Sequence, residues 1–149
     1  MRTLKTTLLV GLTGAMATGL ALAAPAQGNA NAEIGTAHAH ALLSKTANTV
    51  AMAQTHLHHV INCLVGPNGA GFDAAAGNPC KDNGNGAIPD SSGNAALHGK
   101  LQSALADAQA GLKAGSLTAV QDDAGKAAAT LQAASGAASS AAATGSSSW

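Results

Sequence analysis

The chain has 149 residues, of which 46% are hydrophobic, 9% are charged and only two are aromatic. Beyond residue 26 it carries five lysines, no arginine and seven acids, a net charge of −2 with neutral histidines. It therefore lacks both the basic patch that neutralises phosphates and the aromatic platform on which bases stack, which argues against a nucleic-acid partner. The length suits one domain.

Residues 1–26 have the pattern of a secretory signal peptide. A positive start with Arg2 and Lys5 precedes an apolar run over 6–23, and the small residues at 24–26 favour cleavage after position 26. The alternative is an uncleaved anchor. No second apolar run approaches the ~20 residues that span a bilayer. We expect a periplasmic or secreted protein with no membrane attachment after cleavage.

A first helix is predicted from about residue 31 to Val65, and Gly66-Pro67 should end it. A helix of this length would extend about 45 Å at 1.5 Å per residue. Its apolar residues recur at intervals of three and four, which is typical of a helix that packs through one face. The members of this seam are Leu43, Thr46, Val50, Ala53, Leu57, Val60 and Leu64.

The segment 66–93 is rich in Gly, Asn, Asp and Pro, which predicts a loop built from turns. It is longer than an ordinary connection, so we expect it to be functional or tied down. Cys63 and Cys80 are the two cysteines of an exported chain and are predicted to form a disulfide across it. The alternative is that Cys63 is a free thiolate ligand.

Two further helices are predicted, from about Ser92 or Asn94 to 115, and from Ser116 to about Ala134. Both are Ala-rich with a regular apolar seam. The fold class is therefore all-α, an up-down three-helix bundle over 27–135 that dimerises in one alternative into a larger bundle. The Ser-, Ala- and Gly-rich tail at 136–149 is predicted to be disordered.

Histidines are concentrated on the first predicted helix. Met52, His56, His59 and Cys63 follow one another at helical spacing and form a stripe beside the apolar seam. On one continuous helix, His38 would share the side of His56, whereas His40 would lie on the opposite flank with His58.

His56 and His59 are close enough on a helix to bind one metal ion, with Met52 and His98 as further candidate ligands. Imidazole with thioether favours copper, and imidazoles alone also suit zinc or nickel. The competing interpretation is that these side chains are ordinary surface or packing residues. Haem is less favoured because no Cys-x-x-Cys-His motif is present and aromatic residues are scarce.

Two other kinds of site are poorly supported. The segment 82–86 resembles a calcium loop, but glycine occupies its third position, where a ligand oxygen is required, and no Glu follows at position twelve, so we interpret it as a turn. No serine lies in a nucleophile-elbow motif. We therefore expect a protein that is not an enzyme.

With its leader, its Ala-rich helices and the His56/His59 pair, the chain resembles the small His-rich exported helical metal-binding proteins of bacteria. The resemblance implies a bundle that binds copper or other divalent metals for buffering, delivery or tolerance. Histidines are nearly absent from the last two predicted helices, which implies one or two sites rather than high capacity. The alternative function is a structural or interaction module whose His-bordered helix docks to a protein partner.

Overall fold

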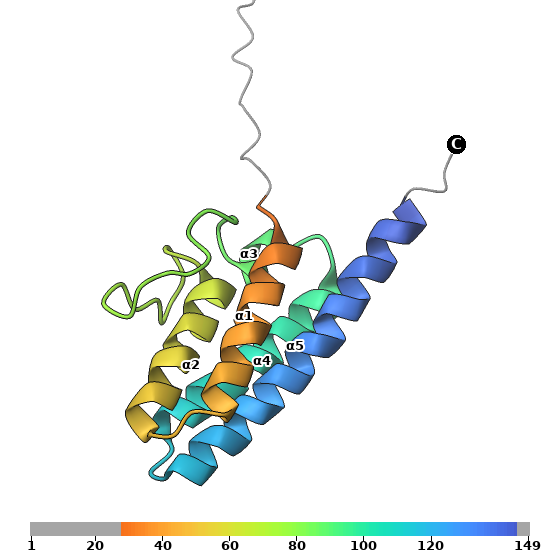
Figure 1. Cartoon of the computed structure of the whole chain (residues 1–149). Helices are drawn as coiled ribbons and strands as arrows, with labels where there is room; N and C mark the ends of the chain where they lie inside the picture. The colour runs from red at the N-terminus through yellow and green to blue at the C-terminus, as the bar shows by residue number, and fades with distance from the viewer. Residues whose placement is uncertain (1–27, 146–149) are drawn as a thin grey trace, which may run out of the picture.

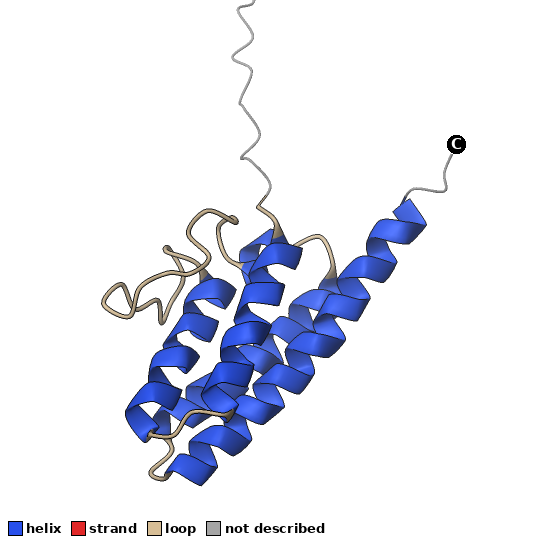
Figure 2. Ribbon diagram, in the orientation of Figure 1, coloured by secondary structure: helices blue, strands red, loops and turns tan. Residues whose placement is uncertain are grey.

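The computed structural model describes residues 28–145, with side chains through residue 138. Within this range the protein forms helices and no strand (Figure 2), which confirms the all-α prediction. The helices are α1 (Ala30–Lys45), α2 (Val50–Val65), α3 (Ala87–Asp90), α4 (Ala95–Lys113) and α5 (Leu117–Gly145). None of the described helices is long and apolar enough to cross a membrane. The predicted signal peptide at 1–26 lies outside the described residues.

The first predicted helix is two helices joined by a tight turn. α1 ends at Lys45 and α2 begins at Val50, so the prediction of one continuous helix was wrong. The Thr49 side chain accepts a hydrogen bond from the Met52 backbone N–H at 3.2 Å and caps α2. Leu43, predicted to lie in the apolar seam, is 48% exposed.

The four long helices form an antiparallel bundle (Figure 1). α1 packs between α2 and α5, and α4 closes the arrangement by packing on both α2 and α5. The bundle therefore has one long helix more than the three predicted, because the turn at 46–49 divides the first predicted helix. The α1–α2 hairpin presents its buried faces to α4 and α5.

Alanine accounts for 12 of the 25 buried hydrophobic residues in the described part of the chain. α1 contributes Ile34, Ala37 and Ala41, while α2 contributes larger side chains that include Leu57 and Leu64. Such small side chains allow close approach of the helices. At the buried Gly111 on α4, a Cβ would lie 2.5 Å from Leu57 Cδ1, so a larger residue there would require the Leu57 side chain to move.

The connection from α2 to α4 is fastened to the bundle at several points. The predicted Cys63–Cys80 disulfide is present, with a Cα–Cα distance of 5.2 Å. α2 ends at Gly66, whose φ of 68° falls in the region that favours glycine, as the sequence predicted. The short α3 is part of this connection and contacts α1, α2 and α4.

Glu33 on α1 is a buried carboxyl that joins the first helix to this connection. Its Oε1 accepts a hydrogen bond from the Gly86 backbone N–H at 2.8 Å. Burial, and secondarily the nearby Asp90 carboxylate, raises the pKa of Glu33 to about 7. This single side chain links α1 and the start of α3.

The last two long helices begin where the sequence predicts. The Asn94 side chain caps α4 by accepting from the Leu97 N–H at 3.0 Å, and Ser116 Oγ accepts from the Ala119 N–H at 3.3 Å. α5 continues to Gly145, so residues 136–145 of the predicted disordered tail are helical. Alanine explains this extension because it has the highest helix propensity. The rest of that predicted tail, 146–149, lies outside the described residues.

Candidate metal centre

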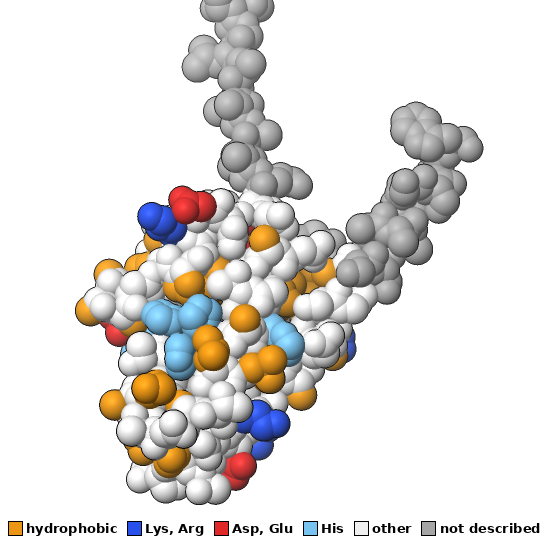
Figure 3. All heavy atoms as spheres, viewed as in Figure 1, with side chains coloured by type: hydrophobic (Ala, Val, Ile, Leu, Met, Phe, Trp, Pro, Cys, Tyr) orange, Lys and Arg blue, Asp and Glu red, His pale blue; other side chains and the backbone are white. Residues whose placement is uncertain are grey.

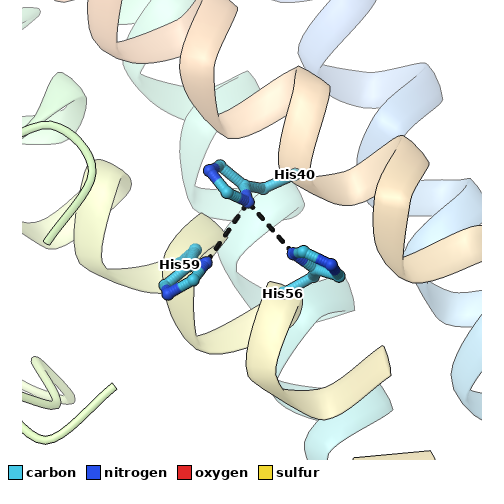
Figure 4. Close-up of side chains that lie close together, drawn as sticks. All are labelled: His40, His56 and His59. Carbon is cyan, nitrogen blue, oxygen red and sulfur yellow. Dashed lines mark hydrogen bonds between the residues drawn. The ribbon is translucent and has the colours of Figure 1, made fainter. Parts of the chain in front are cut away.

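Three histidines from the α1–α2 hairpin converge on one point (Figure 4). His40 comes from α1, and His56 and His59 come from α2. One ring nitrogen of each lies within 4.8 Å of the others, close enough to hold one metal ion. All three side chains are half-buried. Among the described residues, no fourth His, Cys, Asp or Glu joins this group.

The hairpin turn creates this site. Sixteen residues separate His40 from His56, which on a continuous helix corresponds to about 24 Å. In the hairpin their Nδ1 atoms are 3.2 Å apart. One turn after His40, the buried Ser44 hydroxyl donates to the Ala53 carbonyl at 2.8 Å and fixes how α1 lies along α2. The turn thus brings His40 and His56 into contact, whereas on a continuous helix they would lie far apart along the axis.

The protonation of the His59 ring follows from its hydrogen bond. His59 Nε2 lies 2.7 Å from the Ala76 carbonyl oxygen. A carbonyl oxygen only accepts, so Nε2 carries the ring hydrogen and the Nδ1 of neutral His59 carries a lone pair. This assignment leaves Nδ1 ready to bind a metal, an arrangement common among histidine ligands.

His40 Nδ1 contacts both other rings, at 3.2 Å from His56 Nδ1 and 3.3 Å from His59 Nδ1. A neutral ring nitrogen either donates or accepts, so His40 Nδ1 cannot donate to His59 and also accept from His56. If His40 Nδ1 carries a hydrogen, this N–H can point along only one of the two dashed lines in Figure 4, toward His56 or toward His59. The neutral, metal-free cluster therefore leaves one contact unsatisfied. A cation that accepts all three lone pairs would satisfy them together.

Burial and the neighbouring rings favour the neutral form of two of these histidines, His40 and His56. Burial, and then the neighbouring His59 and His56, lower the pKa of His40 to about 4. Burial and His59 also lower the pKa of His56. Neutral imidazole is the form that binds metal ions. The cluster thus holds its nitrogens in the state a ligand requires.

The spacing of the nitrogens suits a tetrahedral ion. Ligand nitrogens about 2.0–2.1 Å from a tetrahedral metal are about 3.3–3.4 Å apart. The two contacts of His40, at 3.2 and 3.3 Å, are near this value. Neighbouring nitrogens around a square-planar ion would be about 2.9 Å apart. The His40 contacts therefore match tetrahedral coordination better.

The predicted ligands are only partly brought together. His56 and His59 belong to the cluster, whereas His98 lies on α4 outside it, with a buried Nδ1 that has no hydrogen-bond partner in the described part of the chain. Met52 lies one turn before His56 and is 50% exposed, and its role as an additional ligand stays a prediction. Cys63 is disulfide-bonded, so the alternative of a free thiolate ligand is wrong.

The sequence interpretation missed His40. It placed His38 on the side of His56 because it assumed a continuous helix, but His38 is not part of the cluster. The polar run Thr46-Ala-Asn-Thr49 was the signal available, since threonine is a good N-cap residue. A break there turns the flank that bears His40 towards α2.

The cluster is accessible from the surface. Figure 3 shows histidine side chains exposed on the face formed by the α1–α2 hairpin, with hydrophobic side chains beside them. His58 points to a separate partner, with its Nδ1 3.2 Å from an Asp73 carboxylate oxygen.

No family model, curated protein or solved structure matches the chain.

Proposed function

We propose that the protein is an exported metal-binding protein that holds one late transition metal ion through the Nδ1 atoms of His40, His56 and His59. The observation that carries this proposal is the pair of 3.2 and 3.3 Å Nδ1–Nδ1 contacts, which neutral rings cannot both satisfy as hydrogen bonds. The disulfide supports an oxidising compartment.

The donor set narrows the choice of metal. Three imidazoles suit zinc, copper and nickel, and near-tetrahedral spacing favours Zn²⁺ or Cu(I) over square-planar Cu(II). The expectation of copper from the sequence depended on the Met52 thioether, which is half exposed to solvent. A Cu(I) site would recruit this side chain, whereas a zinc site would not need it.

The ligand count supports buffering or delivery. Structural zinc sites are usually closed by four protein ligands, and sites that exchange ligands keep a position open. Three histidines in a half-buried cluster leave such a position for water or a group on a receiving molecule. An ion held in this way could be transferred without unfolding the bundle.

The test is titration of the purified, oxidised protein with Zn²⁺, Cu(I), Cu(II) and Ni²⁺. We expect about one equivalent to bind tightly, and His40→Ala to weaken binding more than the ~10–100-fold typical for loss of a ligand's hydrogen-bond partner. His98→Ala is the matched control and should bind like the wild type. Weak binding that is equal in all three proteins would contradict the proposal and favour the interaction module.

A further inference from the structure

Asn62 is a buried polar residue that the metal centre itself does not use. It lies on α2 three residues after His59 and is fully buried. Its Nδ2 donates to the Asp73 carbonyl at 2.7 Å and to the Gly77 carbonyl at 2.6 Å. Its Oδ1 accepts from the Asp73 N–H at 2.8 Å. One amide thus holds both ends of the turn 73–77.

The turn is also braced internally. Asp73 Oδ1 accepts from the Ala75 N–H at 2.9 Å and from the Ala76 N–H at 3.4 Å. Gly77, with φ of 85°, adopts a conformation that favours glycine and lets the chain reverse. The adjacent Cys63 forms the disulfide at the base of the same loop. The carbonyl of Ala76 therefore has a fixed position relative to α2.

We propose that Asn62 is a positioning residue for the metal centre, which holds the turn 73–77 so that the Ala76 carbonyl fixes the ring of His59. The chain of contacts runs from the Asn62 amide to the turn, and from the Ala76 carbonyl to His59 Nε2 at 2.7 Å. That hydrogen bond keeps the hydrogen on Nε2 and turns Nδ1 towards His40. This role explains why an amide is buried beside a metal centre that it does not contact.

The inference rests on the proposed function for its effect on metal affinity, but its first test needs no metal. In the metal-free protein, two-bond ¹H–¹⁵N NMR spectra of the imidazoles report the His59 tautomer and the exchange of its Nε2–H. We expect a single Nε2–H tautomer with slow hydrogen exchange in the wild type. In Asn62→Leu, which keeps the branched shape of the side chain but removes all three hydrogen bonds, we expect fast exchange and a mixture of tautomers.

The second readout is metal affinity, which should fall about 10–100-fold in Asn62→Leu. Asn85→Ala is the matched control, because its side chain bonds Asp90 in the same long connection but not the turn 73–77. It should leave both readouts unchanged. Should Asn62→Leu not fold, Asn62→Ala carries the test, because it removes the same three hydrogen bonds without adding bulk to the buried position.

Unchanged His59 signals in the folded Asn62→Leu variant, or in Asn62→Ala if that variant carries the test, would overturn the role of Asn62. If the wild type binds metal and the variant binds it with the same affinity, the role of Asn62 is overturned as well. Failure of the wild type to bind metal would overturn the proposed function instead. The tautomer result in metal-free protein would then still decide whether Asn62 positions His59.

Discussion

The α1–α2 and α4–α5 hairpins of the bundle are stabilised by different kinds of interaction. The α4–α5 hairpin packs through Leu101, Val120, Leu131 and small residues, with no buried polar side chain among those described. All buried polar residues of the described part precede α4: Glu33, Ser44, Asn62 and Ser91. Apolar periodicity therefore suffices to build one half, and individual hydrogen bonds arrange the half that carries the histidines.

The largest expected effect comes from the apolar hairpin. Leu131 on α5 is fully buried, so Leu131→Ala should leave a cavity in the core. We expect a loss of about 2–5 kcal/mol in the free energy of unfolding, measured by urea denaturation. Leu105→Ala, at a half-buried position on α4, is the matched control and should cost less. Equal losses at both positions would show that the α5 core is not close-packed.

A somewhat smaller effect is expected at Glu33 in the polar half, and it depends on pH. Folding raises the pKa of Glu33 from its ordinary 4.5 to about 7, so the folded state binds more protons between these values. The contribution of this carboxyl to stability is therefore highest at low pH, and it declines as pH rises from 4.5 to 7. The shift corresponds to a loss on the order of 3 kcal/mol.

Glu33→Gln isolates this effect because glutamine keeps an oxygen that can accept from the Gly86 N–H. The variant should be more stable than the wild type at pH 8, and this advantage should shrink towards pH 4.5. Folding lowers the pKa of His40, which gives the free energy of unfolding the opposite pH dependence. This contribution is the same in both proteins and cancels in the comparison. Thermal unfolding at several pH values measures the difference. A constant difference across this range would contradict a raised pKa.

The smallest effect on stability is expected at Ser44, where the effect on the site is more informative. Ser44→Ala removes the buried hydrogen bond to the Ala53 carbonyl, at a cost of about 1 kcal/mol. It should also weaken metal binding, because that bond fixes α1 along α2 beside His40. Ser103→Ala removes an exposed helix hydrogen bond on α4 and should change neither quantity measurably. If Ser44→Ala and Ser103→Ala bind the metal equally tightly, the hydrogen bond of Ser44 does not influence the metal site.

The same contrast explains what the sequence could predict. The starts of α4 and α5 follow from good capping residues at Asn94 and Ser116, and the disulfide follows from two cysteines in a chain with a predicted export signal. His56 and His59 follow from local helical spacing. Each of these predictions depends on residues that are close in sequence or, for the disulfide, on the fact that two cysteines can form only one pair.

The turn at 46–49 and the role of His40 could not be predicted in the same way. Residues Thr46 and Val50 continue the three–four spacing, and neither glycine nor proline marks the break. Periodicity identifies an apolar face but does not say whether the helix is continuous. The break is stabilised by burial of Ile34 and Ala37 on one helix and Leu57 on the other, a tertiary effect. Residues 136–145 were predicted to be disordered because of their Ser and Gly content, whereas their alanines favour the helix found there.

The most direct test of the central claim is X-ray absorption spectroscopy of the zinc-loaded, oxidised protein. The account predicts about three imidazole nitrogens at about 2.0–2.1 Å, with a light atom from solvent in the remaining position. In His40→Ala the imidazole contribution should fall to two or be lost with the metal. A coordination shell of oxygen atoms with fewer than two imidazoles, or one unchanged by His40→Ala, would contradict a metal centre formed by His40, His56 and His59.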